Sequence, residues 1–240
     1  FDADGVEQRQ AARLVCVAGN TIESPRLLLN SASSMFPDGL ANSSGQVGRN
    51  YMRHVTGSVY SIFEQPVRMW RGTVMAGIMQ DEAHHDPGRG FVAGYELETL
   101  SLGLPFMAAF LDPGAWGREF TSALDGYENM AGMWIVGEDM PQETNRITVD
   151  TGVLDQFGLP TPVVHYDDHP NDVAMRDHAY ARGIAIHKAA GAVRSLPTPP
   201  YPSTHNIGSN RMSDNPRDGV VNRWGQSHDL SLIHISEPTR

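Results

Sequence analysis

The first apolar pattern along the chain predicts a strand, a tight turn and a helix. Residues 13–17 form a short apolar run of β type, and residues 18–20 supply a turn. Ser24 is a good N-cap, Pro25 fits the first helical position, and the leucine-rich run after it continues the helix to Asn30. This order of elements lets α/β folds present backbone N–H groups to a dinucleotide, although the pattern alone is common.

From Tyr51 onward the pattern changes to short β-type runs, separated by loops rich in Gly, Pro and Asp. The runs lie at residues 57–63, 146–150 and 162–166. Their lengths and the turn residues between them predict an antiparallel sheet.

One helix stands out in this β-rich region, from about Asn171 to about Gly191. Apolar residues recur along it at Met175, Ala179 and Ile186, and a glycine fits the C-terminal stop. The proline-rich residues 195–203 then form a stiff, extended connector.

The composition sets broad limits on function. With 240 residues, of which 40% are hydrophobic, the chain predicts a globular protein of one large or two small domains. A formal net charge of −10 argues against a nucleic-acid partner. The longest apolar run, residues 100–111, is too short to span a bilayer and is expected in the core or at an internal interface. The single Cys16 excludes an intramolecular disulfide and a cysteine zinc site, and is expected to be buried and inert.

Two polar stretches have simple structural explanations. Residues 88–93 match G-x-G-x-x-A formally, but Asp-Pro precedes them and no helical pattern follows, so a loop is expected. His84 and His85 lie among acidic residues in a turn-like region. Their spacing matches no standard metal site, so a solvated loop is expected there too.

A better set of possible metal ligands combines two histidines with two aspartates. These residues are His165, Asp167, Asp168 and His169. The stretch from Asp168 to Asn171 is also an ordinary helix start, which is the favoured interpretation, so no metal site is predicted.

His205 is the strongest candidate for chemistry. It lies in a loop of sequence STHNIGSNRM, where small hydrogen-bonding residues and Gly208 allow a substrate close to the backbone. An imidazole can act as a general base near neutral pH. From composition alone, a structural histidine remains the alternative.

Separated motifs of the chain resemble the glucose-methanol-choline (GMC) family of flavin-dependent alcohol oxidoreductases. Residues 17–32 are similar to the family's second signature, in which Ser-Pro precedes a leucine-rich helix, and residues 203–230 are similar to its C-terminal stretch, His-x-x-Gly-Thr-x-Arg-Met-Gly. Between them, residues 47–54 resemble Val-Gly-x-Asn-Leu-x-Asp-His, and residues 155–160 resemble the gluconate, fructose and sorbitol dehydrogenase branch. The likeness covers nearly all of residues 2–230.

Several positions depart from the family pattern. Asn20 and Thr21 stand where the second signature has a Gly-Ala pair, Arg53 occupies an acidic position, and Ser209 replaces the threonine after Gly208.

The resemblance implies an α/β plus α+β fold, in which part of an FAD-binding Rossmann-like domain joins an antiparallel-sheet substrate domain. The implied bounds are residues 1–50 for part of the FAD-binding domain, 51–195 for the substrate domain, 196–229 for the return to the FAD-binding domain, and 230–240 for a non-native tail.

The resemblance also implies roles for particular residues. His205 takes the position of the catalytic base, which removes a hydroxyl proton while the carbinol hydride passes to N5 of FAD. Ala18, Gly19 and Asn20 would lie near the cofactor, whereas Asn50 and His54 are expected to organise structure.

The implied substrate is an alcohol, polyol or sugar, and the electron acceptor is left open between a dehydrogenase and an oxidase. The resembling branch includes periplasmic complexes with a cytochrome c subunit and a small export subunit, so these partners are implied. The compartment is left open, with the periplasm as the location that this branch suggests. A non-catalytic, β-rich carbohydrate-binding protein is the alternative from another class.

Both ends of the chain depart from this family pattern. The family's first dinucleotide fingerprint would precede Phe1, and its second active-site histidine or asparagine would follow Leu230. Residues 230–240 resemble the translation of a sequencing adapter, with a native strand over LIHI as the alternative. We therefore expect this polypeptide by itself to be inactive and to bind FAD poorly.

Overall fold

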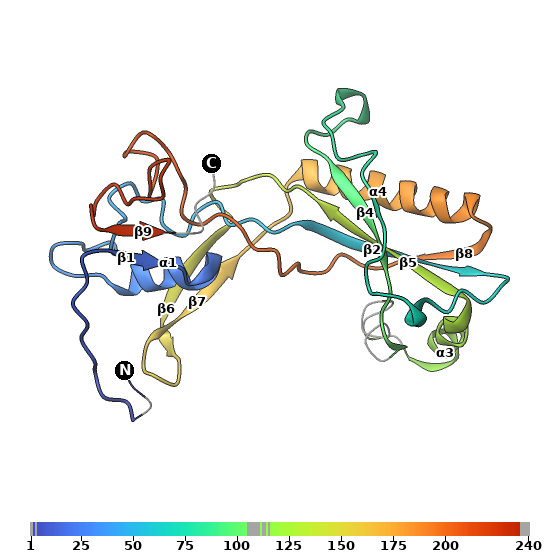
Figure 1. The fold of residues 1–240 in the computed structure, drawn as a ribbon, viewed down its shortest axis with the longest axis horizontal. Helices are drawn as coiled ribbons and strands as arrows, with labels where there is room; N and C mark the ends of the chain where they lie inside the picture. The colour runs from blue at the N-terminus through green and yellow to red at the C-terminus, as the bar shows by residue number, and fades with distance from the viewer. Residues whose placement is uncertain (1, 3, 105–110, 112–113, 115, 236–240) are drawn as a thin grey trace. The chain divides into compact units, whose positions relative to one another are not determined.

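The structure is a computed structural model that describes residues 2, 4–104, 111, 114 and 116–235. The chain divides into two compact units, and each is built from separate segments of sequence (Figure 1). The first unit comprises residues 1–52, 141–167 and 206–240, and the second comprises residues 53–140 and 168–205.

The second unit is built on a five-stranded antiparallel sheet, which confirms the sheet predicted from the β-type runs. The strand order is β3-β4-β5-β2-β8. The strands are β2 (Val55–Phe63), β3 (Ile78–Met79), β4 (Tyr95–Leu100), β5 (Met130–Gly137) and β8 (Ala192–Pro197).

Helix α4 (Pro170–Ala189) covers one face of this sheet, as Figure 1 shows. The helix agrees with the one expected near residues 171–191. Its fully buried Met175 and Ala179 pack with Tyr95, Leu97 and Ile135 of the strands. This apolar layer fixes which side of each strand faces the helix, because side chains alternate along a strand.

The opposite face of the sheet is divided into two parts. At one end, Tyr60, Leu100 and Met130 form a second apolar cluster, against which residues of α3 (Gly117–Asp125) and the short helix η3 (Tyr127–Asn129) pack. The other part carries polar and aromatic side chains. They include Thr56, Ser58, Glu96, Glu98 and Trp134, which we call the polar half of the sheet.

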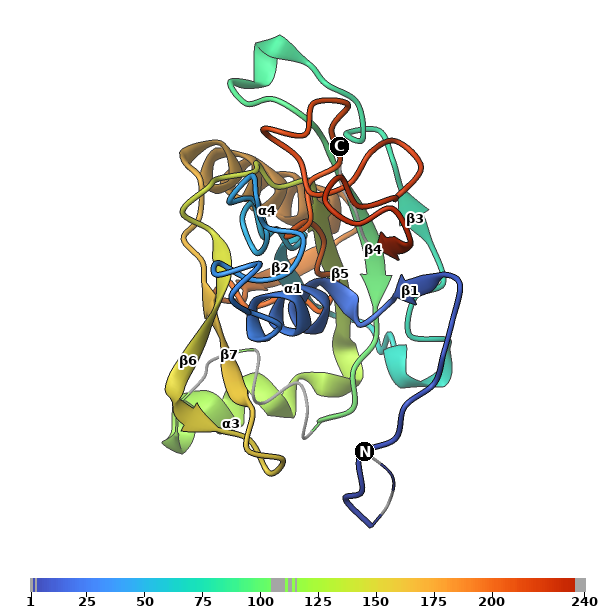
Figure 2. The ribbon, with the colours of Figure 1, turned by 90° about the vertical axis from the view of Figure 1, so that its left-hand side faces the viewer.

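In the first unit, β1 (Val15–Val17) leads into helix α1 (Asn20–Asn30), as Figure 2 shows. Helix α1 contacts a hairpin of β6 (Arg146–Leu154) and β7 (Pro160–His165). The remaining strand is β9 (Ile233–Ile235), and the short helices η1 (Met69–Arg71) and η2 (Pro87–Arg89) belong to the second unit.

Strand β9 pairs in parallel with β1, and Ile235 is buried in the core with Val17, Leu28 and Val221. The structure thus contains a strand over Ile233–Ile235, the alternative considered for LIHI, whereas residues 236–240 lie outside the described part of the chain. The predicted bounds 1–50, 51–195, 196–229 and 230–240 stay a prediction. By contacts, residues 141–167 group with the first unit and residues 196–205 with the second.

Two local expectations need correction. Helix α1 begins at Asn20, so Ser24 lies inside it and Pro25 is an internal proline. Cys16 is exposed, because β1 has a strand partner on one side only within the described sheet and its first two residues face solvent. The apolar run at 100–111 was expected in the core or at an internal interface. Its residues Leu100 and Leu111 are buried, in agreement, and residues 105–110 lie outside the described part.

No helix within the described residues is long and apolar enough to cross a membrane.

Two buried carboxyl groups lie where the chain enters and leaves the second unit. Asp139, 9% exposed, accepts a hydrogen bond from the backbone N–H of Arg53 at 2.7 Å. Asp172, 1% exposed, accepts one from Met140 at 3.1 Å. Burial raises the pKa of Asp139 to about 7, and the nearby charge of Asp172 adds to the shift.

This shift predicts a pH-dependent loss of stability. Because the folded pKa of Asp139 lies above the unfolded value of 3.8, its contribution is fully present below about pH 4 and is lost as the pH rises through 7. We expect Asp139→Asn, which stays neutral and keeps an acceptor oxygen, to raise the free energy of unfolding at pH 8 by on the order of a few kcal/mol.

Urea unfolding monitored between pH 4 and pH 8 checks this prediction. The exposed Asp177→Asn on α4 is the matched control and should leave the pH dependence as it is in the wild type. Parallel stability curves for the wild type and Asp139→Asn would contradict the assignment.

Candidate functional site

His205 lies at the end of the second unit, directly after the proline-rich connector. Its backbone N–H donates to Oγ of Ser203 at 2.9 Å, and its side chain is exposed. Its ring meets two others edge-on, His54 at a centroid distance of 5.0 Å and Trp134 at 5.4 Å. The imidazole is therefore held by neighbours and still reachable by a substrate.

The two histidines share a hydrogen bond, with Nδ1 of His205 3.2 Å from Nδ1 of His54. Burial lowers the pKa of His54, and the charge of His205 lowers it further, against the opposing effect of Glu96 and Glu138. A neutral His54 can accept the Nδ1–H of His205. In that tautomer Nε2 of His205 carries a lone pair, which a general base requires.

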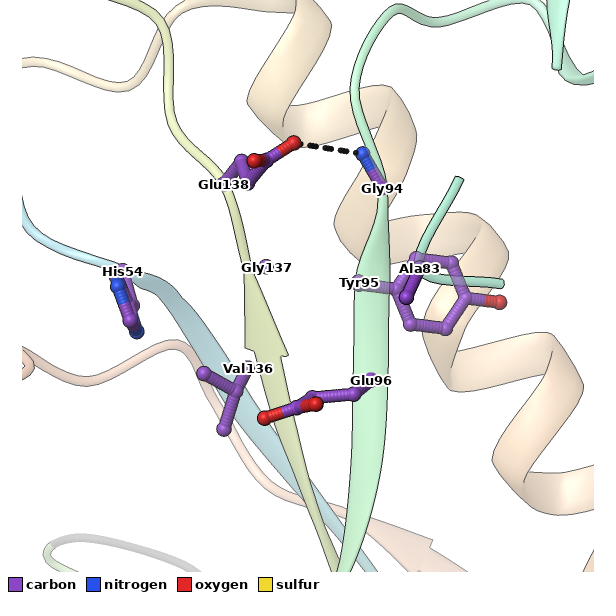
Figure 3. Close-up of a pocket in the computed structure, with 8 residues that line it drawn as sticks. All are labelled: His54, Ala83, Gly94, Tyr95, Glu96, Val136, Gly137 and Glu138. Atoms are coloured by element: carbon purple, nitrogen blue, oxygen red, sulfur yellow. Dashed lines mark hydrogen bonds between the residues drawn. The ribbon is translucent and has the colours of Figure 1, made fainter. Parts of the chain in front are cut away.

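A cavity of about 260 Å³ opens beside His54 at the edge of the polar half of the sheet (Figure 3). Glu138 accepts a hydrogen bond from the backbone N–H of Gly94 at 3.1 Å across its rim, and Glu96 accepts one from Gln80 at 3.0 Å. Its eight lining residues include two carboxylates and one imidazole, and no Lys or Arg. They are His54, Ala83, Gly94, Tyr95, Glu96, Val136, Gly137 and Glu138.

The loop after His205 is tied to helix α1 in the first unit. Pro25 has no N–H, so the carbonyl of Thr21, four residues earlier, loses its usual helical donor. Oγ of Ser209 donates to this carbonyl at 2.6 Å, and Oγ1 of Thr21 donates to the carbonyl of Asn206 at 3.1 Å. Ser209 is fully buried, so water does not compete for the bond.

The same loop is also tied to residues 48–52. Ile207 and Met52 exchange two backbone hydrogen bonds of 2.9 Å, and Gly48 donates to the carbonyl of Ser209 at 2.7 Å. Gly208 has a φ of +90°, and a Cβ there would clash with the carbonyl of Asn50, so only glycine fits. Three stretches that carry the sequence motifs, 17–32, 47–54 and 203–212, thus meet at this loop.

The predicted cofactor-binding residues Ala18, Gly19 and Asn20 form the turn between β1 and α1, as expected. Gly19 donates its backbone N–H to Oγ of Ser24 at 3.0 Å. Asn20 adopts a φ of +68°, which asparagine tolerates better than most residues, and its Oδ1 accepts the N–H groups of Ile22 and Glu23. Their role towards the cofactor stays a prediction.

The other polar candidates have structural roles. Nδ1 of His169 accepts the N–H of Asn171 at the start of α4, and Asp168 forms an ion pair with Arg176 at 2.7 Å. His165 hydrogen-bonds Thr148 in the hairpin. No group of three or more possible metal ligands occurs among the residues that the structure describes.

Residues 84–93 do not form the strand, glycine turn and helix of a dinucleotide-binding fingerprint. His84 and His85 are exposed, and Pro87–Arg89 forms a single 3₁₀ turn. A strand and a helix do not flank this segment as the fingerprint requires.

Sequence reasoning missed the polar half of the sheet. Its signal was the alternation in Tyr95–Leu100, where Tyr95 and Leu97 face the core and Glu96 and Glu98 face the other side. Two acidic residues with a period of two on a strand indicate a polar sheet face.

Comparisons with known proteins agree with this arrangement. Residues 141–236 match the family model described as GMC oxidoreductase. The 2-methyl-1,2-propanediol dehydrogenase of Mycolicibacterium austroafricanum is 34% identical, with 96% of this chain and 44% of that protein covered. The fructose dehydrogenase large subunit of Gluconobacter japonicus is 30% identical, with 98% and 44% covered.

Among solved structures, a formate oxidase matches with a TM-score of 0.62 at 14% identity, covering 94% of this chain and 49% of the other. That likeness shows the fold, in which an antiparallel sheet accompanies a strand, turn and helix. The chain belongs to the GMC oxidoreductase family. It spans 44% of the length of the two curated relatives named above.

Because Pro25 leaves the carbonyl of Thr21 without a helical donor, the effects of substituting Ser209 and Pro25 on the free energy of unfolding should depend on each other. Ser209→Ala leaves the carbonyl of Thr21 buried without a donor, which should lower the free energy of unfolding by about 1–3 kcal/mol. Pro25→Ala restores a helical N–H to that carbonyl, so Ser209→Ala should cost less in that background.

A double-mutant cycle by chemical denaturation measures the difference. Equal costs of Ser209→Ala in both backgrounds would show that the hydroxyl does not replace the missing donor.

Proposed function

We propose that the protein containing this chain oxidises the CH–OH group of an alcohol, polyol or sugar with FAD as cofactor, and that His205 is the general base. The observation that carries the proposal is the contact between Nδ1 of His205 and Nδ1 of His54. It can hold an exposed imidazole in the tautomer that leaves Nε2 free to accept a proton. The relatives named as dehydrogenases support the reaction type.

Two features of the first unit fit a flavin. Asn210 is fully buried, and neither Nδ2 nor Oδ1 has a partner within the described part of the chain. A side-chain amide of this kind suits the ring edge of a flavin, which offers both carbonyl and N–H groups. Ala18, Gly19 and Asn20 supply a turn before a helix, where a cofactor phosphate is favoured by the helix dipole.

In this proposal FAD, when bound, takes up the hydride from the carbinol carbon. Nε2 of His205 accepts the hydroxyl proton as the C–H bond breaks, so negative charge does not accumulate on the oxygen that becomes the carbonyl. His54 is a positioning residue, because it acts on His205 rather than on the substrate.

The partners are part of the same proposal. One relative is named as a large subunit, which supports assembly with further subunits. We propose a cytochrome c subunit as electron acceptor and a small export subunit. An oxidase, in which oxygen accepts the electrons, is the second candidate, supported by a relative named paromamine 6′-oxidase of Streptomyces fradiae at 26% identity.

The base assignment predicts a large kinetic effect. In the FAD-loaded enzyme, His205→Ala should slow flavin reduction by an alcohol substrate roughly 100- to 10,000-fold, because the developing alkoxide charge is no longer neutralised. Stopped-flow absorbance of the flavin measures this rate. His84→Ala, on an exposed loop, should leave it unchanged, and a nearly normal rate in His205→Ala would overturn the assignment.

The positioning role of His54 is tested by two substitutions. His54→Ala removes the acceptor for Nδ1–H of His205, so we expect a lower kcat and a shifted midpoint in the pH profile of kcat/KM. His54→Asn keeps an acceptor oxygen near the same place and should return both towards the wild type. If alanine and asparagine behave alike, His54 does not act through this hydrogen bond.

A further inference from the structure

Two side chains of the polar half of the sheet lie directly opposite each other beside His205. Glu98 on β4 and Trp134 on β5 are partners in the strand register. Such partners in an antiparallel pair have Cβ atoms about 4.5–5.5 Å apart. The ring of Trp134 also contacts the ring of His205, at 5.4 Å between centroids. Both side chains are therefore neighbours of the proposed base.

Each of these side chains buries one polar atom. Nε1 of Trp134 and Oε2 of Glu98 have almost no accessible surface, and neither has a hydrogen-bond partner among the residues that the structure describes. A buried polar atom without a partner costs about 1–3 kcal/mol, and such atoms in native proteins need a specific explanation. Two of them on paired residues of neighbouring strands point to a ligand that would complete both.

The two atoms have complementary needs. The indole N–H only donates, and a carboxylate oxygen accepts. A hydroxyl group accepts through its lone pairs and donates its proton, so one hydroxyl can satisfy both atoms. An ammonium group cannot accept from Trp134, and a substrate carboxylate would be repelled by Glu96. Burial and the nearby Glu96 raise the pKa of Glu98, and a hydroxyl can satisfy its carboxyl group in either protonation state.

The surroundings leave room for more than one polar group. Glu96 lies on the same strand and the same side as Glu98, and it lines the cavity of about 260 Å³ beside His54. The cavity therefore lies beside His54, and Glu98 lies opposite Trp134, which contacts His205. A small polyhydroxylated molecule could extend along this face with several of its oxygens in contact.

We propose that Trp134 and Glu98 together bind a second hydroxyl of the substrate, so that the enzyme selects diols and polyols over simple alcohols. The inference rests on the proposed function and deepens it, because it names the substrate class. Because Trp134 contacts the ring of the proposed base, we expect the bound hydroxyl on a carbon near the oxidised one. Trp134 and Glu98 are specificity-determining residues and take no part in the proton transfer.

Substrate pairs that differ by one hydroxyl test the proposal. In the FAD-loaded enzyme we expect kcat/KM for 1,2-propanediol to exceed that for 1-propanol, and Trp134→Phe and Glu98→Leu to reduce this ratio roughly 10- to 100-fold. Trp70→Phe is the matched control, because Trp70 stacks on Tyr127 elsewhere in the same unit. A ratio that neither variant changes would overturn the proposal.

A binding measurement on the chain itself gives a readout that does not depend on activity. The indole N–H resonance of Trp134, assigned by its loss in Trp134→Phe, should shift on titration with 1,2-propanediol and not with 1-propanol. A shift with both ligands or with neither overturns the proposal, the latter being the result if ordered water fills the site. If His205→Ala leaves flavin reduction unchanged while the diol still shifts this resonance, the proposed function fails and the hydroxyl site stands.

Discussion

A single backbone carbonyl organises the first unit around the histidine loop. Pro25 interrupts the hydrogen bonding of α1, and the carbonyl of Thr21 that it releases is taken by the hydroxyl of Ser209, 188 residues further along the chain. A proline inside a helix usually weakens it. Here the released carbonyl anchors the loop that begins at Asn206. One hydrogen bond therefore explains both the Ser-Pro pair of the first motif and the Gly-Ser pair of the second.

In the second unit, one face of the sheet is used for packing and part of the other carries the polar side chains of the candidate site. Helix α4 and the apolar residues opposite it stabilise the strands, which leaves the other face free to carry Glu96, Glu98 and Trp134. Because strand register fixes these side chains, they need little further ordering when a substrate arrives. Tyr60, Leu100 and Met130 close the far end of that face and keep the polar half limited to the neighbourhood of His54 and His205.

The elements with strong local patterns were predictable from the sequence. The helix near 171–191 and the strand at 57–63 follow from periodicity, and the motif around His205 was enough to make it the candidate base. The start of α1 was not predictable. Ser24-Pro25 resembles a helix start locally, and the internal proline is stabilised by Ser209, which is distant in sequence. Trp134 and Glu98 were missed for a similar reason: their pairing depends on the register of β4 and β5, which no short segment encodes.

The division of each unit among separated segments also constrains how the protein is made. Strand β1 pairs with β9, so the smallest sheet of the first unit closes only after more than 200 residues have followed it. The interior strand β2 of the second unit likewise waits for its neighbour β8. Neither unit can therefore fold as a contiguous stretch while the chain leaves the ribosome, and slow, late closure is expected from such distant contacts. During synthesis the exposed edges of β1 and β2 would be the surfaces most in need of protection by chaperones.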